Sequence, residues 1–220
     1  MLKVYGRDIF ENNVFSWESW SADVLQMPNE VRDAFDRLNL CGNIISNIAA
    51  VGYVYNLAQY RLADDDDSWL YKDEAIFPCC IIIDEPMIIS LRNGDRLEIE
   101  FSDASSVRIS KNCLPHNIVP GTNANNVDVA KLFSCCLSET IVGLEIKSTD
   151  KYPWGTGSHG IILAEGKDEY IESVNILLSN AKKLKFEDRY DYCCVTVTNE
   201  AGEPLDVSFA DVKLALLNYN

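Results

Sequence analysis

The sequence is poor in basic residues. Its 220 residues include 19 lysines and arginines against 34 aspartates and glutamates, which gives a formal net charge of −15 at pH 7. Binding to nucleic-acid phosphates or to anionic lipids depends on lysine and arginine, and an acidic surface repels both. We therefore expect neither direct nucleic-acid binding nor membrane binding.

Long apolar runs are also absent. No stretch of 18 apolar residues occurs, and the first residues, MLKVYGRDIFENNVF, contain no apolar core of signal-peptide length. This pattern predicts a cytoplasmic protein without a membrane-spanning segment. In a cytoplasmic chain of this size, the eight cysteines are expected to be reduced and most of them to pack in the core.

Histidine occurs only twice, at His116 and His159, both in predicted loops. A Cys113–His116 or a Ser158–His159 catalytic pair would need a local frame such as a nucleophile elbow, and neither has one. The stretch GTGSHG, residues 155–160, has the glycine spacing of a dinucleotide-binding loop but lacks the strand before it and the helix after it. We predict no catalytic residue and no cofactor.

Metal-binding spacing is missing as well. Adjacent cysteines on a strand point to opposite faces instead of to one ion, and six of the eight form such doublets: Cys79-Cys80, Cys135-Cys136 and Cys193-Cys194. The acidic run Asp64–Asp67 contains no glycine, and the twelfth residue from Asp64 is Ala75 instead of the glutamate of a calcium loop. No metal site is predicted.

The chain is nevertheless rich in core-forming residues, with 47% hydrophobic and 10% aromatic content. A chain of this length can bury about 70% of its unfolded surface. The segment PNEVRDAFDRLNLCG predicts an amphipathic helix with Pro28 in its first turn and Gly42 beyond its end. A second helix is expected to begin near Asn126, with its inward face formed by Val129, Leu132, Phe133 and Cys136.

Residues 87–101, MIISLRNGDRLEIEF, form the clearest β-hairpin pattern. A two-residue turn would set every apolar side chain opposite a charge, because parity fixes which residues face each other. A three-residue loop that ends in a left-handed Gly94 instead pairs Ile89 with Leu97. We predict this second register, which leaves a polar set on the other face: Ser90, Arg96, Glu98 and Glu100.

The fold class expected from these patterns is α+β, mainly antiparallel sheet with a few amphipathic helices. The hairpin at residues 87–101 resembles the stretch VNILLSNAKKLKFED, residues 174–188, and a predicted helix precedes each. This suggests two similar helix-plus-sheet units, residues 1–112 and 126–220, joined by a linker or crossover at 113–125. The alternatives are a chance likeness of two hairpins and a single domain over residues 1–220.

The acidic, aromatic-containing loop RLADDDDSWLYKDE, residues 61–74, is the candidate contact surface. An acidic surface favours fast encounter with a basic one, and an aromatic anchor amid charges is common at interfaces. We predict a non-enzymatic binding protein, of inhibitor or immunity type, that docks a basic nucleic-acid-binding protein or cationic toxin by occupancy or nucleic-acid mimicry. The predicted contact residues are Asp64, Asp65, Asp66, Asp67, Trp69, Tyr71, Asp73 and Glu74.

Three other interpretations remain open. The acidic loop is solvated and contacts nothing, as most single charge runs do. The protein is an enzyme whose dispersed residues meet near His159, Trp154 and the acidic loop. The protein is a structural or assembly component, which would show an extensive apolar patch and self-association.

Overall fold

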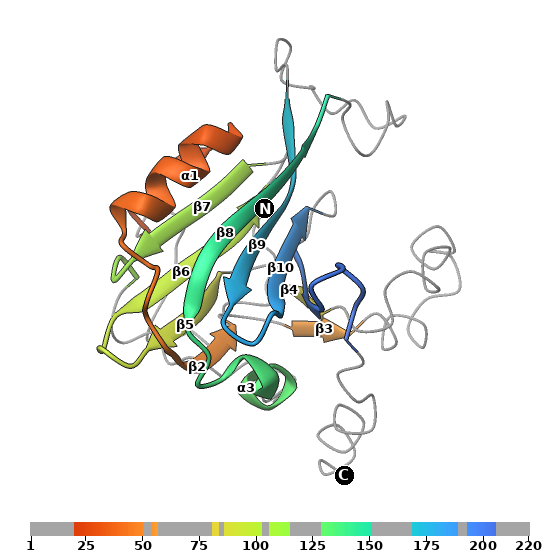
Figure 1. Cartoon of the computed structure of the whole chain (residues 1–220). Coiled ribbons are helices and arrows are strands. Elements are labelled where there is room, and N and C mark those ends of the chain that lie inside the picture. The colour runs from red at the N-terminus through yellow and green to blue at the C-terminus, as the bar shows by residue number, and fades with distance from the viewer. Residues whose placement is uncertain are drawn as a thin grey trace.

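The computed structural model describes residues 20–50, 54–56, 81–83, 86–102, 106–114, 129–150, 169–188 and 193–205, which form two antiparallel β-sheets (Figure 1). Within these residues the first sheet has five strands in the order β1 (Val24–Leu25), β7 (Ser106–Lys111), β6 (Arg96–Ser102), β5 (Met87–Leu91) and β2 (Ile45–Ala50). The second has six, in the order β3 (Val54–Asn56), β4 (Ile81–Ile83), β11 (Cys193–Thr198), β10 (Lys183–Asp188), β9 (Tyr170–Leu178) and β8 (Ile141–Thr149). The helical elements are α1 (Pro28–Arg37), the one-turn helix α3 (Val129–Leu132) and the 3-10 turn η2 (Ser134–Cys136).

The two sheets pack against each other around one hydrophobic cluster. Successive side chains of a strand point to opposite faces, so each strand gives alternate residues to this cluster. The fully buried residues at its centre include Leu97, Ile99, Leu184, Phe186 and Val195. The predicted architecture of mainly antiparallel sheet with accompanying helix is therefore confirmed.

Helix α1 begins at Pro28, as the sequence predicts, and ends at Arg37. The Glu30 carboxylate accepts hydrogen bonds from the backbone N–H groups of Gln26 and Met27 at 2.8 and 3.0 Å, which fixes the direction in which the chain enters the helix. The helix packs against β7 and β8 through its apolar face, to which Val31, Ala34 and Phe35 belong (Figure 1).

The β5–β6 hairpin has the predicted register, with Ile89 opposite Leu97. Its three-residue loop is closed by the Leu91 N–H, which donates to the Asp95 carbonyl at 2.8 Å, and Gly94 has the predicted left-handed backbone, with φ +92°. The Asn93 side chain accepts a hydrogen bond from the Asp95 N–H at 3.0 Å. Parity arguments from the sequence were sufficient here because turn and pattern are adjacent in the chain.

The β9–β10 hairpin repeats this turn. The Leu178 N–H donates to the Lys182 carbonyl at 2.9 Å, and the Asn180 side chain accepts from the Lys182 N–H at 3.1 Å. The left-handed position is held by Ala181, with φ +61°, in place of a glycine. Because alanine carries a Cβ, this backbone is strained in β9–β10 and relaxed in β5–β6.

Exchanging the two residues at this position is expected to change stability in opposite directions. Ala181→Gly relieves the left-handed strain and raises the free energy of unfolding by about 1 kcal/mol, whereas Gly94→Ala lowers it by about 1 kcal/mol. A Cβ at Gly94 would meet no atom within 4 Å, so backbone strain alone sets its effect. Urea denaturation of both variants checks the signs, and changes of the same sign would contradict the shared turn geometry.

The two sheets are joined by a reciprocal set of backbone hydrogen bonds at the starts of β2 and β8. The Ile45 N–H donates to the Glu139 carbonyl at 2.9 Å, and the Ile141 N–H donates to the Asn43 carbonyl at 2.8 Å. Each of these two strands carries a register shift just after its first residue. Helix α1 packs against β8, and α3 packs against β2. Each helical element thus contacts the first strand of the other sheet.

Two sequence predictions need correction. The helix predicted from Asn126 is short: its described part is only the turn α3 and then η2, and among the described residues α1 is the only helix longer than four residues. The predicted few amphipathic helices are therefore not confirmed. The stretch from Ile44 to Asn56, expected as strand, forms β2 and β3 in different sheets, since β3 pairs with β4 and β4 with β11. The predicted domain boundary at residues 113–125 stays a prediction.

Candidate functional site

The acidic stretch 61–74 lies in the connection from β3 to β4. These strands pair antiparallel with Asn56 opposite Ile81, and β3 is the outermost described strand of its sheet. Paired strands lie about 5 Å apart. The chain therefore leaves the sheet edge at Asn56 and returns beside its point of departure, so one pair of strands holds both ends of the connection.

The residues predicted to make the contact all fall in this connection and outside the described residues: Asp64, Asp65, Asp66, Asp67, Trp69, Tyr71, Asp73 and Glu74. The same is true of His116, and of Trp154 and His159 in the alternative enzymatic site. The predictions for these side chains stay predictions.

A buried carboxylate, Glu98, lies on the side of β6 opposite to the hydrophobic cluster. It accepts hydrogen bonds from the Ser110 hydroxyl at 2.5 Å and from the backbone N–H groups of Cys113 and Leu114 at 2.9 and 3.1 Å. The Arg96 guanidinium lies 3.7 Å from Glu98 Oε1 and donates to the Leu114 carbonyl. These contacts replace the water that burial removes from the charges.

Trp20 lies over the same face and is itself buried. Its indole N–H donates to the Ser110 hydroxyl at 2.7 Å, and the Arg108 guanidinium lies 5.8 Å from its ring centre. Both carboxylate oxygens of Glu98 are engaged by groups of the protein, so this network stabilises the fold and offers no reactive group. The hairpin register indicated a polar face on β6, but nothing local in the sequence indicated that Trp20 and residues 113–114 bury it.

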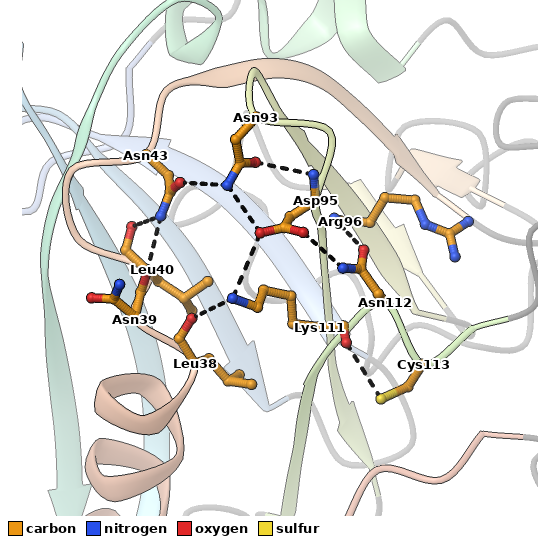
Figure 2. Close-up of polar contacts among 10 residues, drawn as sticks. All are labelled: Leu38, Asn39, Leu40, Asn43, Asn93, Asp95, Arg96, Lys111, Asn112 and Cys113. Carbon is orange, nitrogen blue, oxygen red and sulfur yellow. Dashed lines mark hydrogen bonds and ion pairs between the residues drawn. The ribbon is translucent and has the colours of Figure 1, made fainter.

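A second polar cluster joins three turns near the surface (Figure 2). The Asn93 amide donates to Asn43 Oδ1 at 3.0 Å and to Asp95 at 2.9 Å, and the Asn112 amide donates to Asp95 at 2.8 Å. The hydrogen bond from Asn112 has the largest effect on the pKa of Asp95, which lies below its ordinary value, and Lys111, 3.6 Å away, lowers it further. The cluster ties the β5–β6 turn to the start of β2 and the end of β7.

The outer face of the second sheet carries paired charges. The Lys183 ammonium donates to Glu145 at 2.9 Å, and the Asn175 amide donates to the other Glu145 oxygen at 2.8 Å. These bonds, Lys183 foremost, hold the pKa of Glu145 below its ordinary value. Three buried atoms beside them have no hydrogen-bond partner in the part of the chain that the structure describes: Ser173 Oγ, Asn175 Oδ1 and Thr196 Oγ1. Such atoms gain most from an added donor, which makes this face a second candidate contact surface.

The described cysteines correct the sequence prediction in part. Cys136 and Cys193 are buried, as expected, but Cys41 is exposed. Cys194 is disulfide-bonded, so the expectation that all cysteines are reduced is wrong at this position. Among the described residues, no three histidine, cysteine, aspartate or glutamate side chains gather closely enough to hold a metal ion.

No described helix has both the length and the apolar character needed to cross a membrane. Comparison with known proteins adds no relative: no family model, no curated protein and no solved structure matches the chain.

Proposed function

We propose that this chain is a non-enzymatic binding protein that docks a basic surface of another protein through its acidic stretch, residues 61–74. The partner class is a nucleic-acid-binding protein or a cationic toxin, and the chain acts by occupying the partner's basic surface, as an inhibitor or immunity-type protein does. We place this action in the cytoplasm.

The observation that carries the proposal is the net charge of −15, with four of the acids consecutive beside Trp69 and Tyr71. Like-sign charge steers a basic partner towards the protein and raises the association rate, most strongly at low salt. An aromatic side chain amid the acids supplies the apolar contact that charge alone does not.

The attachment of the acidic stretch supports the same function. Its connection starts and ends on the paired strands β3 and β4 at a sheet edge. Binding residues are often carried on connections that a rigid scaffold holds. Closing both ends on one strand pair also lowers the entropy that the connection has left to lose on binding.

Affinity capture with the full-length protein tests the proposal. Capture from a lysate of the source cell at low and high salt, followed by mass spectrometry, is expected to recover a basic protein whose yield falls with salt. With the purified partner, the combined change of Asp64–Asp67 to asparagine should weaken binding by at least about tenfold, or 1.4 kcal/mol.

A matched control separates local contact from total charge. Asp23, Asp33, Asp36 and Glu200 are all exposed and lie outside the acidic stretch. Changing these four to asparagine or glutamine removes the same charge and should weaken binding by less than about threefold, because screened distant charges contribute little. Equal effects from both variants, or no partner at either salt, would contradict the proposal.

We also propose that the two sheets derive from one duplicated unit. The shared β5–β6 and β9–β10 turns, the register shifts at the starts of β2 and β8, and the reciprocal bonds of Ile45 and Ile141 support this. Homologous chains offer a test: profiles of the two halves built from them should align with Leu91 on Leu178 and Leu97 on Leu184. An alignment no better than that of shuffled profiles would argue for chance likeness.

A further inference from the structure

Two adjacent thiols occupy the turn η2, which precedes β8. A 3-10 helix has three residues per turn, so neighbouring side chains leave its axis about 120° apart. Cys136 accordingly points into the hydrophobic cluster and is fully buried, whereas Cys135 is only half-buried. Both carry free thiols. The turn therefore presents one sulfur towards the surface and keeps the other inside.

The surroundings of the pair favour a single negative charge on the outer sulfur. The side chain of Cys136 hydrogen-bonds to Cys135 and is the largest effect in lowering the pKa of Cys135 to about 6. The positive charge of Lys182 adds to this, while burial and the charge of Glu139 oppose it. The same hydrogen bond, together with burial, raises the pKa of Cys136. Near neutral pH the pair thus holds one proton, on Cys136.

The turn is fixed against a neighbouring element. The Asn180 amide, in the β9–β10 turn, donates to the Cys135 carbonyl at 3.0 Å. Lys182 follows in the same turn, whose backbone is closed by the bond from Leu178. The thiol pair and the cation are consequently held together by two elements that are far apart in the sequence.

We propose that Cys135 is a modification site that forms mixed disulfides with small disulfides such as glutathione disulfide, with Cys136 and Lys182 holding its sulfur as the thiolate. The Cys135 thiolate attacks one sulfur of the reagent, and the new S–S bond forms as the old one breaks. The other half of the reagent leaves with the electron pair and takes a proton from solvent. Cys135 is oxidised, the leaving sulfur is reduced, and Cys136 keeps its proton.

The pH at which the rate is measured decides how clearly this site stands out. A thiol of pKa about 6 is half ionised at pH 6, about 150-fold more than an ordinary thiol of pKa about 8.5. Its lower basicity reduces its nucleophilicity about 13-fold, because the Brønsted slope is about 0.45. The net expectation is a rate about tenfold above that of an ordinary thiol at pH 6, with little difference left at neutral pH.

Stopped-flow reaction of the full-length protein with 5,5′-dithiobis(2-nitrobenzoate) across pH provides the test. We expect one fast phase with its midpoint near pH 6, present in Cys41→Ser and absent in Cys135→Ser. Lys182→Gln should keep the phase and move its midpoint upward, since it removes the cation without touching either thiol. Incubation with glutathione disulfide at pH 6 should give one adduct, located on Cys135 by mass spectrometry.

Three results would overturn the proposal. They are a fast phase that survives in Cys135→Ser, a Cys135 midpoint near pH 8.5 in the unaltered protein, and a glutathione adduct that is absent from Cys135. A Lys182→Gln midpoint equal to that of the unaltered protein would remove Lys182 from the site.

Discussion

Replacing Glu98 with alanine is expected to lower the free energy of unfolding by about 3–5 kcal/mol, the range found when one partner of a buried ion pair is removed. The change leaves the Arg96 guanidinium without its carboxylate and the backbone N–H groups of Cys113 and Leu114 without acceptors. Because Trp20 and Leu114 are buried over this face, water cannot replace the lost acceptor without opening it. Denaturation by urea, analysed at constant m-value, measures the loss.

Two further variants define what the Glu98 result means. Glu98→Gln keeps the shape, removes the charge and turns an amide NH₂ towards donors, so its loss should be smaller than that of alanine but still above about 1 kcal/mol. Glu200→Ala, at an exposed position, should stay within about 0.5 kcal/mol of the unaltered protein. A Glu98→Ala loss below about 1 kcal/mol would show that the network contributes little to stability.

Ile45→Ala and Ile141→Ala are each expected to lower the free energy of unfolding by about 2–5 kcal/mol, the range for truncating a buried isoleucine. Both side chains are fully buried where the two sheets join, and both belong to the hydrophobic cluster. Their backbones make matching bonds across the junction, so the two losses should agree within about 1 kcal/mol.

The neighbouring Val142 supplies the control for this pair. Its side chain is 54% exposed in the same strand, so Val142→Ala should cost less than about 0.5 kcal/mol. If Ile141→Ala cost no more than Val142→Ala, the junction would not be a packed part of the core. A difference above about 2 kcal/mol between the two isoleucine variants would show that their surroundings are not equivalent.

The sequence predicted those elements whose determinants are close together in the chain. The register of β5–β6 follows from the spacing of Ile89, Gly94 and Leu97 within a few residues. The start of α1 follows from Pro28 and the apolar period after it. In both cases turn chemistry and hydrophobic pattern act on the same short segment and agree.

Long-range pairing was beyond local patterns. The run Ile81–Ile83 has no alternation of apolar and polar residues, so parity does not choose its neighbour, and β4 pairs with β11 near the other end of the chain. The helix expected from Asn126 has the right apolar period at Val129, Phe133 and Cys136. It tightens into η2 because serine and cysteine are weaker helix formers than alanine or leucine.

The candidate site was predictable in composition and less so in geometry. The acidic, aromatic stretch stands out in the sequence, and the structure adds that its connection begins and ends on one strand pair. The burial of Glu98 depends on Trp20 and Leu114, which are distant from it in sequence. The charge on Cys135 depends on Lys182, in another turn. Contacts of this kind are set by the folded topology instead of by neighbouring residues.

The crossed arrangement of the sheets has a consequence for how the protein unfolds. Helix α1 belongs to the first half of the chain yet packs on β8, α3 packs on β2, and β4 is inserted beside β11. Neither half can lose its structure without stripping a strand or a helix from the other. Opening therefore spreads through the whole molecule as a single cooperative transition, and local fraying is confined to strand ends and surface turns.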